Sequence, residues 1–81
     1  MKVHVQFFSL LRDLVGTADV ILEVPEPTTV ADLLEIVYAK TPQVRNWDKS
    51  ILVASGLDFV ARGYAIKPGD EISIMPPVQG G

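Results

Sequence analysis

The spacing of the apolar residues changes along this 81-residue chain, and that change constrains the fold more than any other feature. Residues 3–8 alternate, with Val3, Val5 and Phe7 on one side, which is the period of a half-buried strand. Residues 30–40 carry apolar side chains three and four apart, which is the period of a helix buried along one face. One such helix across one face of a mixed sheet buries both patterns, so we expect an α+β fold.

The flanking residues predict where the helices begin and end. Thr29 and Asp32 have the spacing of a capping box before the principal helix, and Pro42 ends that helix. Ser9 is the expected N-cap of a short helix with Leu10, Leu11 and Leu14 on its core side, and Gly16 is its expected C-terminal stop.

The remaining strands are predicted from β-rich runs between turn residues. Residues 19–24 form a strand that ends at Pro25-Glu26-Pro27, and Pro68-Gly69 forms the turn before the last strand. Adjacent strands at the N-terminus are expected to pair antiparallel, while the helical connection favours a parallel neighbour in the same sheet. The other expected segments are a connection over 41–50 in which Trp47 plugs an edge of the core, and strands at 51–55, 59–60 and 71–75.

Composition excludes several classes of function. A chain of this length buries a thin core and is too small to enclose a deep catalytic cleft. The net charge of −3 has the wrong sign for nucleic acid or an anionic membrane surface, and no apolar run is long enough to span a bilayer. Without cysteine there is no disulfide framework and no thiolate site, which favours a reducing cytoplasmic location.

Catalytic and metal-binding signals are weak in this sequence. His4 is the only imidazole, and its place on an alternating strand indicates a surface or partner-facing residue rather than a general base. One histidine without cysteine or a tight group of carboxylates predicts no metal site. We therefore expect neither a metal nor a permanently bound cofactor.

The end of the chain carries the strongest functional signal. Pro76 and Pro77 extend the backbone directly after the last strand, and Val78 and Gln79 lead to the terminal pair Gly80 and Gly81. Glycines leave the terminal carboxylate without neighbouring side chains, so such an end fits a narrow tunnel. We expect residues 1–75 to form the folded domain and residues 76–81 an extended tail made for insertion.

Three segments together closely resemble the small subunits of molybdopterin synthase. These are the tail Pro-Pro-Val-x-Gly-Gly, the stretch from Phe7 to Gly16 and the Pro68-Gly69-Asp70-Glu71-Ile72 turn. The resemblance covers essentially the whole chain and implies a β-grasp, ubiquitin-like fold, with a mixed sheet of four to five strands and one principal helix on one face.

The resemblance also implies a sulfur carrier. In such proteins an E1-like adenylyltransferase uses ATP to adenylate the C-terminal carboxylate, here that of Gly81, and a sulfur donor protein supplies the sulfur that replaces AMP. The resulting thiocarboxylate enters the active site of the large subunit and donates sulfur to cyclic pyranopterin monophosphate. The small subunit is then no enzyme alone, and two small and two large subunits assemble in this family.

By position in the family pattern, the partner-binding residues include Phe8 and Arg12 near the first helix, Phe59 on the late hairpin and Met75 before the tail. Val78, Gln79 and Gly80, with the two prolines, belong to the inserted tail. Core packing of Phe8 and Phe59, and a merely solvated Arg12, are the plain alternatives. Three other functions stay open at this point. They are a thiamine-type sulfur carrier, a ubiquitin-like protein modifier joined through Gly81 to lysines, and a plain interaction module with a disordered tail.

Overall fold

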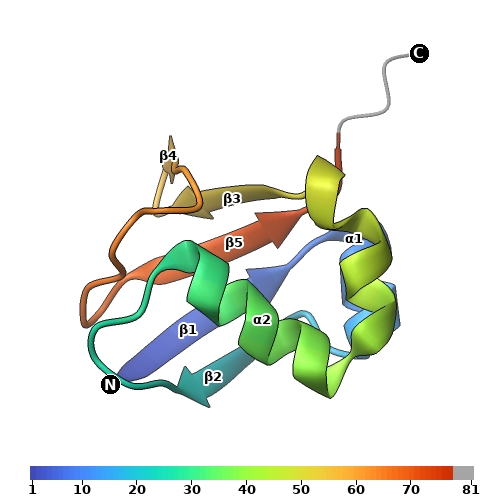
Figure 1. The fold of residues 1–81 in the computed structure, drawn as a ribbon. Helices are drawn as coiled ribbons and strands as arrows, with labels where there is room; N and C mark the ends of the chain where they lie inside the picture. The colour runs from blue at the N-terminus through green and yellow to red at the C-terminus, as the bar shows by residue number, and fades with distance from the viewer. Residues whose placement is uncertain (78–81) are drawn as a thin grey trace.

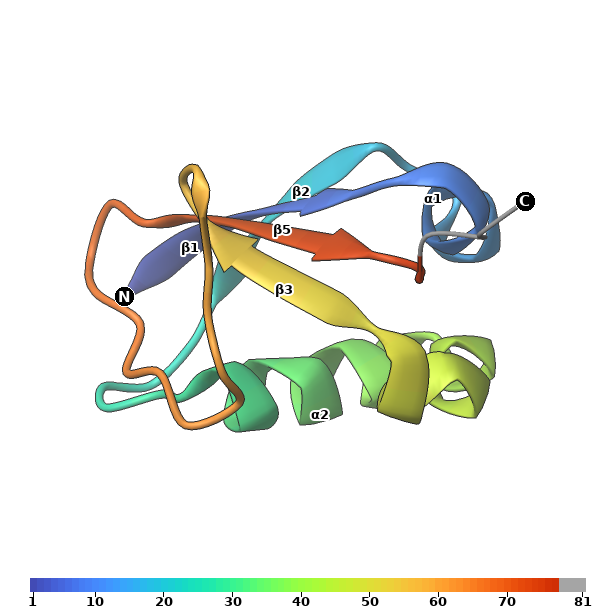
Figure 2. The same ribbon diagram turned by 90° about the horizontal axis from the view of Figure 1, so that it is seen from above.

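The computed structural model describes residues 1–77 and contains a five-stranded mixed sheet with α2 across one face (Figures 1 and 2). Within residues 1–77, no helix covers the other face of the sheet, as Figure 2 shows. The predicted α+β class, with one principal helix on one face, is therefore confirmed. The elements in chain order are β1 (Lys2–Phe7), α1 (Ser9–Val15), β2 (Asp19–Glu23), α2 (Val30–Lys40), the 3₁₀ helix η1 (Pro42–Ser50), β3 (Leu52–Ser55), β4 (Asp58–Phe59) and β5 (Glu71–Met75).

The strands lie in the order β2-β1-β5-β3-β4, so the last strand of the chain lies in the middle of the sheet. The predicted antiparallel pairing of β1 with β2 is confirmed, and β5 runs parallel to β1 and antiparallel to β3. The strands before and after α2 run in the same direction but are separated by β1 and β5. The parallel neighbours are thus β1 and β5, the two strands nearest the chain ends.

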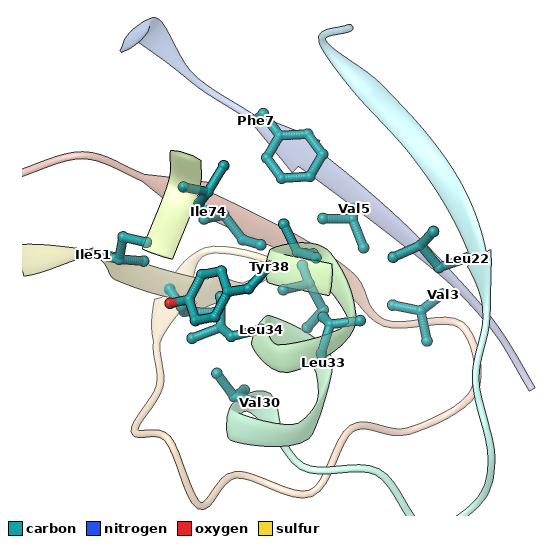
Figure 3. Close-up of a cluster of buried hydrophobic side chains, with 14 of the residues drawn as sticks. Val3, Val5, Phe7, Leu22, Val30, Leu33, Leu34, Tyr38, Ile51 and Ile74 are labelled. Carbon is teal, nitrogen blue, oxygen red and sulfur yellow. The ribbon is translucent and has the colours of Figure 1, made fainter. Parts of the chain in front are cut away.

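The core lies between the inner face of the sheet and α2 (Figure 3). Alternate residues of the strands point toward the helix, and the helix presents the face predicted from its apolar spacing. The buried side chains include, from the sheet, Val3, Val5, Phe7, Leu22, Ile72 and Ile74, and, from α2, Val30, Leu33, Leu34, Val37 and Tyr38.

Local signals placed the ends of α2 correctly and those of α1 only in part. Thr29 accepts from the Asp32 amide at 3.2 Å and its own amide donates to the Asp32 carboxylate at 3.1 Å, which confirms the capping box. Gly16 ends α1 in the left-handed region at φ 92°, also as predicted. The prediction that Ser9 caps α1 is wrong, because the Leu11 and Arg12 amides donate to the Phe8 carbonyl. Phe8 is the N-cap, and Ser9 lies inside the helix with φ at 51°.

Segment bounds differ from the prediction at a few places. Strand β1 ends at Phe7 rather than at residue 8, and β4 covers Asp58–Phe59 rather than residues 59–60. The expected connection over 41–50 is a 3₁₀ helix whose Val44 is fully buried, and Trp47 packs partly against the core as expected. Pro42 starts this helix, because a proline is tolerated in a first turn where no backbone donor is required.

A core truncation tests this packing. Leu33→Ala removes a fully buried side chain of α2, so we expect the free energy of unfolding to fall by about 2–4 kcal/mol in urea titrations. Leu57→Ala is the matched control, because Leu57 is fully exposed and the same truncation there should change stability by less than about 0.5 kcal/mol. Equal losses in the two variants would contradict this core.

Candidate functional site

Strand β5 fixes the root of the C-terminal tail. It hydrogen-bonds to β1 on one side and β3 on the other, and its Ile72 and Ile74 are fully buried. The Phe8 amide donates to the Ile74 carbonyl at 3.2 Å, which extends the pairing beyond the end of β1. Pro76 and Pro77 therefore leave the sheet from a strand that is paired on both sides.

An open groove of about 500 Å³ lies at this root. It brings together four of the residues expected to bind partners, Phe8, Met75, Pro76 and Pro77. Ser9, Leu10 and Trp47 complete its wall. Phe8 remains 43% exposed although it is a large apolar residue, and such exposure next to other apolar groups is typical of an interaction surface.

The apolar surface continues from the groove across the outer face of the sheet. Leu52 lies opposite Met75 in the register of β3 with β5, and 39% of its surface is exposed. Phe59 lies opposite Ala54, two residues further along β3, and is 70% exposed. The outer face of β3, β4 and β5 thus carries apolar residues that the core does not use, and Phe59 is not a core residue.

Arg12 lies apart from this surface. Its guanidinium is exposed and 3.9 Å from the carboxylate of Asp13, and it lines a shallow hollow with Gly16 and Thr17 at the end of α1. The structure thus does not join Arg12 to the groove. The remaining predicted site residues, Val78, Gln79, Gly80 and Gly81, lie outside the described residues.

His4 lies on the helix-free face of the sheet, between acidic side chains of the two flanking strands. Its Nδ1 is 3.3 Å from the Glu71 carboxylate and its Nε2 is 3.7 Å from that of Asp19.

Residues 1–77 contain no group of three or more histidine, cysteine, aspartate or glutamate side chains that could hold a metal. Across the same residues, no helix has the length and apolar character needed to cross a membrane.

Comparison with known proteins identifies the family. The family model described as the ThiS family matches residues 5–81, which is most of the chain. The chain belongs to the ThiS family. A molybdopterin synthase sulfur carrier subunit from Drosophila yakuba is 35% identical to it over 83 residues, covering 100% of this chain and 92% of the relative. The resemblance to molybdopterin synthase small subunits is thereby confirmed.

Solved structures confirm the β-grasp fold of this ThiS-family chain. SAMP1 from Haloferax volcanii, a small archaeal modifier protein, matches with a TM-score of 0.85 and 28% identity over 100% of both chains. The complex of subunits 1 and 2 of molybdopterin-converting factor from Helicobacter pylori contains a chain that matches with a TM-score of 0.69 over 100% of both chains. At 22% identity, the second match supports the fold alone.

Sequence reasoning missed the place of Leu10 in the groove of this ThiS-family chain. Leu10 was expected on the core side of α1, yet it is 37% exposed, and Leu11 alone of the helix is fully buried. A two-turn helix at the end of a sheet has room to bury one leucine, so the other remains at the surface. The run of apolar residues at 7, 8, 10 and 11 could have indicated an exposed apolar surface here, because one strand face and one short helix cannot bury all four side chains.

A polar network around Asp48 holds η1, and with it Trp47, in place. The Tyr38 hydroxyl donates to Asp48 Oδ1 at 2.5 Å, and Arg62 Nη1 donates to the same oxygen at 3.2 Å. A second nitrogen of Arg62 donates to the backbone carbonyl of Asp48. The hydrogen bond from Tyr38, assisted by Arg62, holds the pKa of Asp48 below its usual range. Burial, with the same carboxylate nearby, raises the pKa of Tyr38.

Removal of the Tyr38 hydroxyl should weaken the fold in a pH-dependent way. Because the pKa of Asp48 is lower in the folded state, its bonds stabilise the fold above the unfolded pKa and stop doing so as the pH falls through the folded pKa. We expect Tyr38→Phe to cost about 1 kcal/mol at neutral pH, since the Asp48 side chain is partly exposed to solvent. Urea titrations from pH 7 to 2 should show that cost shrinking in acid.

Glu35→Gln is the control for this measurement. It removes the exposed ion pair of Glu35 with Arg45, 2.7 Å apart on the same surface, and leaves the Asp48 network in place. The control should follow the parent chain across the pH range. A Tyr38→Phe deficit that stays constant down to pH 2 would show that Asp48 is not the partner that matters.

Proposed function

We propose that this chain is the sulfur carrier subunit of a molybdopterin synthase. The observation that carries the proposal is its 35% identity, along its whole length, to a curated sulfur carrier subunit of that enzyme. A human protein of the same name is 25% identical over 99% of this chain. The sequence also ends in the Gly80-Gly81 pair that the chemistry of a carrier requires.

The proposed reaction uses the C-terminal carboxylate of Gly81. A carboxylate is a poor electrophile, so an E1-like adenylyltransferase first joins it to the AMP part of ATP and releases pyrophosphate. Hydrosulfide (HS⁻) delivered by a donor protein then attacks the acyl carbon, and AMP leaves with the bonding electron pair. The product is a thiocarboxylate, whose nucleophilic sulfur forms a bond to cyclic pyranopterin monophosphate. Water then cleaves the bond between that sulfur and the acyl carbon, which returns Gly81 to a carboxylate. Two such deliveries build the dithiolene of molybdopterin.

In this proposal the chain needs no catalytic pocket of its own. Residues 1–75 act as the folded domain, and residues 76–81 act as a tail that enters the active site of the large subunit. Anchoring of β5 by two neighbouring strands supports this division, because a pull on the tail is resisted by both ladders. We propose that two small and two large subunits form the assembly, and that nucleotide is bound only together with the activating enzyme.

The apolar surface around the tail root is the proposed contact for the large subunit. Phe8 and Met75 in the groove, with Phe59 on the outer face, would be covered by the partner while the tail is inserted. Apolar and aromatic residues at the centre of such contacts supply most of the binding energy. Arg12, at the end of α1, would lie at the rim and contribute less.

A change at the chain end tests the chemistry. We expect the parent chain, incubated with its activating enzyme, ATP and a sulfur source, to gain the mass of one sulfur-for-oxygen exchange. One alanine added after Gly81 should abolish this gain and all sulfur transfer, because the activated carboxylate would be displaced from its site. Intact-mass spectrometry measures the gain of sulfur, and a thermal melt measures the stability of the fold. The melting temperature of the extended chain should equal that of the parent. Full activity after deletion of Gly80 and Gly81 would refute the proposal.

Truncation of the groove tests the contact surface. Phe8→Ala should weaken binding to the large subunit by about 1–3 kcal/mol in calorimetry, since it removes an aromatic anchor. Ile21→Ala is the matched control, because Ile21 is also exposed and apolar but lies on β2, two strands away from β5. Equal affinity of Phe8→Ala and the parent chain would place the contact elsewhere.

A protein modifier remains the second candidate, because the chain is 28% identical to the small archaeal modifier SAMP1 over its whole length. The same acyl adenylate would react with a lysine amine as well as with sulfur. Conjugates of high mass that carry this chain in a cell lysate would support the modifier function, and their absence would oppose it. A thiamine-type carrier differs in its acceptor, so activity with cyclic pyranopterin monophosphate and the large subunit decides between the two carriers.

A further inference from the structure

Strand β2 forms an open edge of the sheet. It pairs with β1 on one side and is the first strand in the order of the sheet (Figure 1). An open edge presents unpaired backbone donors and acceptors, and another extended chain can add to them. This edge is two strands away from β5 and plays no part in the proposed sulfur chemistry.

The register identifies the free backbone groups. Val24 exchanges both of its bonds with Met1, and the Ala18 carbonyl accepts from Phe7, so alternate residues between them face β1. Ile21 and Glu23 therefore direct their amides and carbonyls away from the sheet. Within residues 1–77 these four groups have no hydrogen-bond partner, whereas the Asp19 carbonyl accepts from the Thr17 hydroxyl.

An apolar groove of about 210 Å³ lies beside this edge, between β2 and the C-terminal end of α2. Val20 and Leu22 of the strand and Val37 of the helix form much of its wall. Both strand residues point to the helix side of the sheet, in register with Val5 and Val3 respectively. A strand added to β2 would therefore insert every second side chain into this groove.

The charges of the edge select the kind of strand that fits. Asp19 and Glu23 lie on either side of Ile21 on the opposite, helix-free face, and both are exposed. A second copy paired antiparallel through Ile21 would place Asp19 against Glu23 twice, and like charges directly opposite each other are unfavourable. The edge thus resists its own copy and favours a strand with a positive charge at both ends.

We propose that β2 and this groove bind an extended segment of a partner protein, which adds as a sixth, antiparallel strand. The matching segment has five residues in the order basic, apolar, any, apolar, basic. Its central residue exchanges both backbone bonds with Ile21, its two apolar residues enter the groove beside Val20 and Leu22, and its basic residues pair with Asp19 and Glu23.

The probe is the capped peptide Gly-Lys-Val-Thr-Val-Lys-Gly, titrated into the full ¹⁵N-labelled chain. We expect NMR shifts at the Ile21 and Glu23 amides and at residues lining the groove. Ile21→Pro should weaken binding about tenfold or more, because it removes one backbone donor and bends the edge. Proline is tolerated there because the Ile21 amide faces away from the ladder. Ile21→Thr, which keeps that donor and a β-branched side chain, should bind like the parent chain.

Two changes in the peptide test the proposal without altering the protein. An N-methyl group on the central threonine removes the donor to the Ile21 carbonyl and should weaken binding by a similar factor. Glutamate in place of both lysines should abolish binding. The proposal is overturned by unchanged spectra, by shifts confined to the Phe8 and Met75 groove, or by equal affinity of the glutamate peptide. The proposal would also be overturned if sedimentation showed that the chain associates with itself through β2.

Discussion

Pairing of β5 with strands on both sides is the interaction on which the rest of this structure depends. It places the end of the chain next to its beginning, because β5 runs parallel to β1, and it brings Ile72 and Ile74 under α2. The same pairing brings Met75 beside Phe8 and opposite Leu52. The apolar surface at the tail root therefore forms only when β5 has paired with β1 and β3. The domain therefore folds and assembles this surface in the same step.

The two faces of the sheet differ in burial, because one packs against α2 and the other is exposed. The inner face supplies the core against α2, with every second residue of β1 and β5 buried (Figure 3). The outer face is covered by no helix of the described residues 1–77, and it retains exposed apolar residues such as Phe59 at β4 and Ile21 at β2. In a chain this small, burial of one face leaves little surface for a cleft, and the carrier function proposed above does not require one.

Much of the fold could be predicted because the relevant signals are local. The capping box at Thr29 and Asp32, the stop at Gly16 and the alternation of Val3, Val5 and Phe7 each depend on residues a few positions apart. The wrong N-cap of α1 and the wrong end of β1 both fall at the junction of these two elements. There, Phe8 rather than Ser9 caps the helix, because the Phe8 amide is already bonded to Ile74, a residue near the other end of the chain.

The sequence by itself determined the class of the fold through its periodicity, and it indicated the family through the resemblance of its motifs. The chemistry proposed for Gly81 rests on that resemblance. Only the tertiary structure decided which residues share a surface. It joined Phe8, Leu10, Trp47 and Met75 in one groove and left Arg12 outside it. It also exposed the edge of β2, because strand order depends on which distant segments pair, and no local pattern encodes that choice.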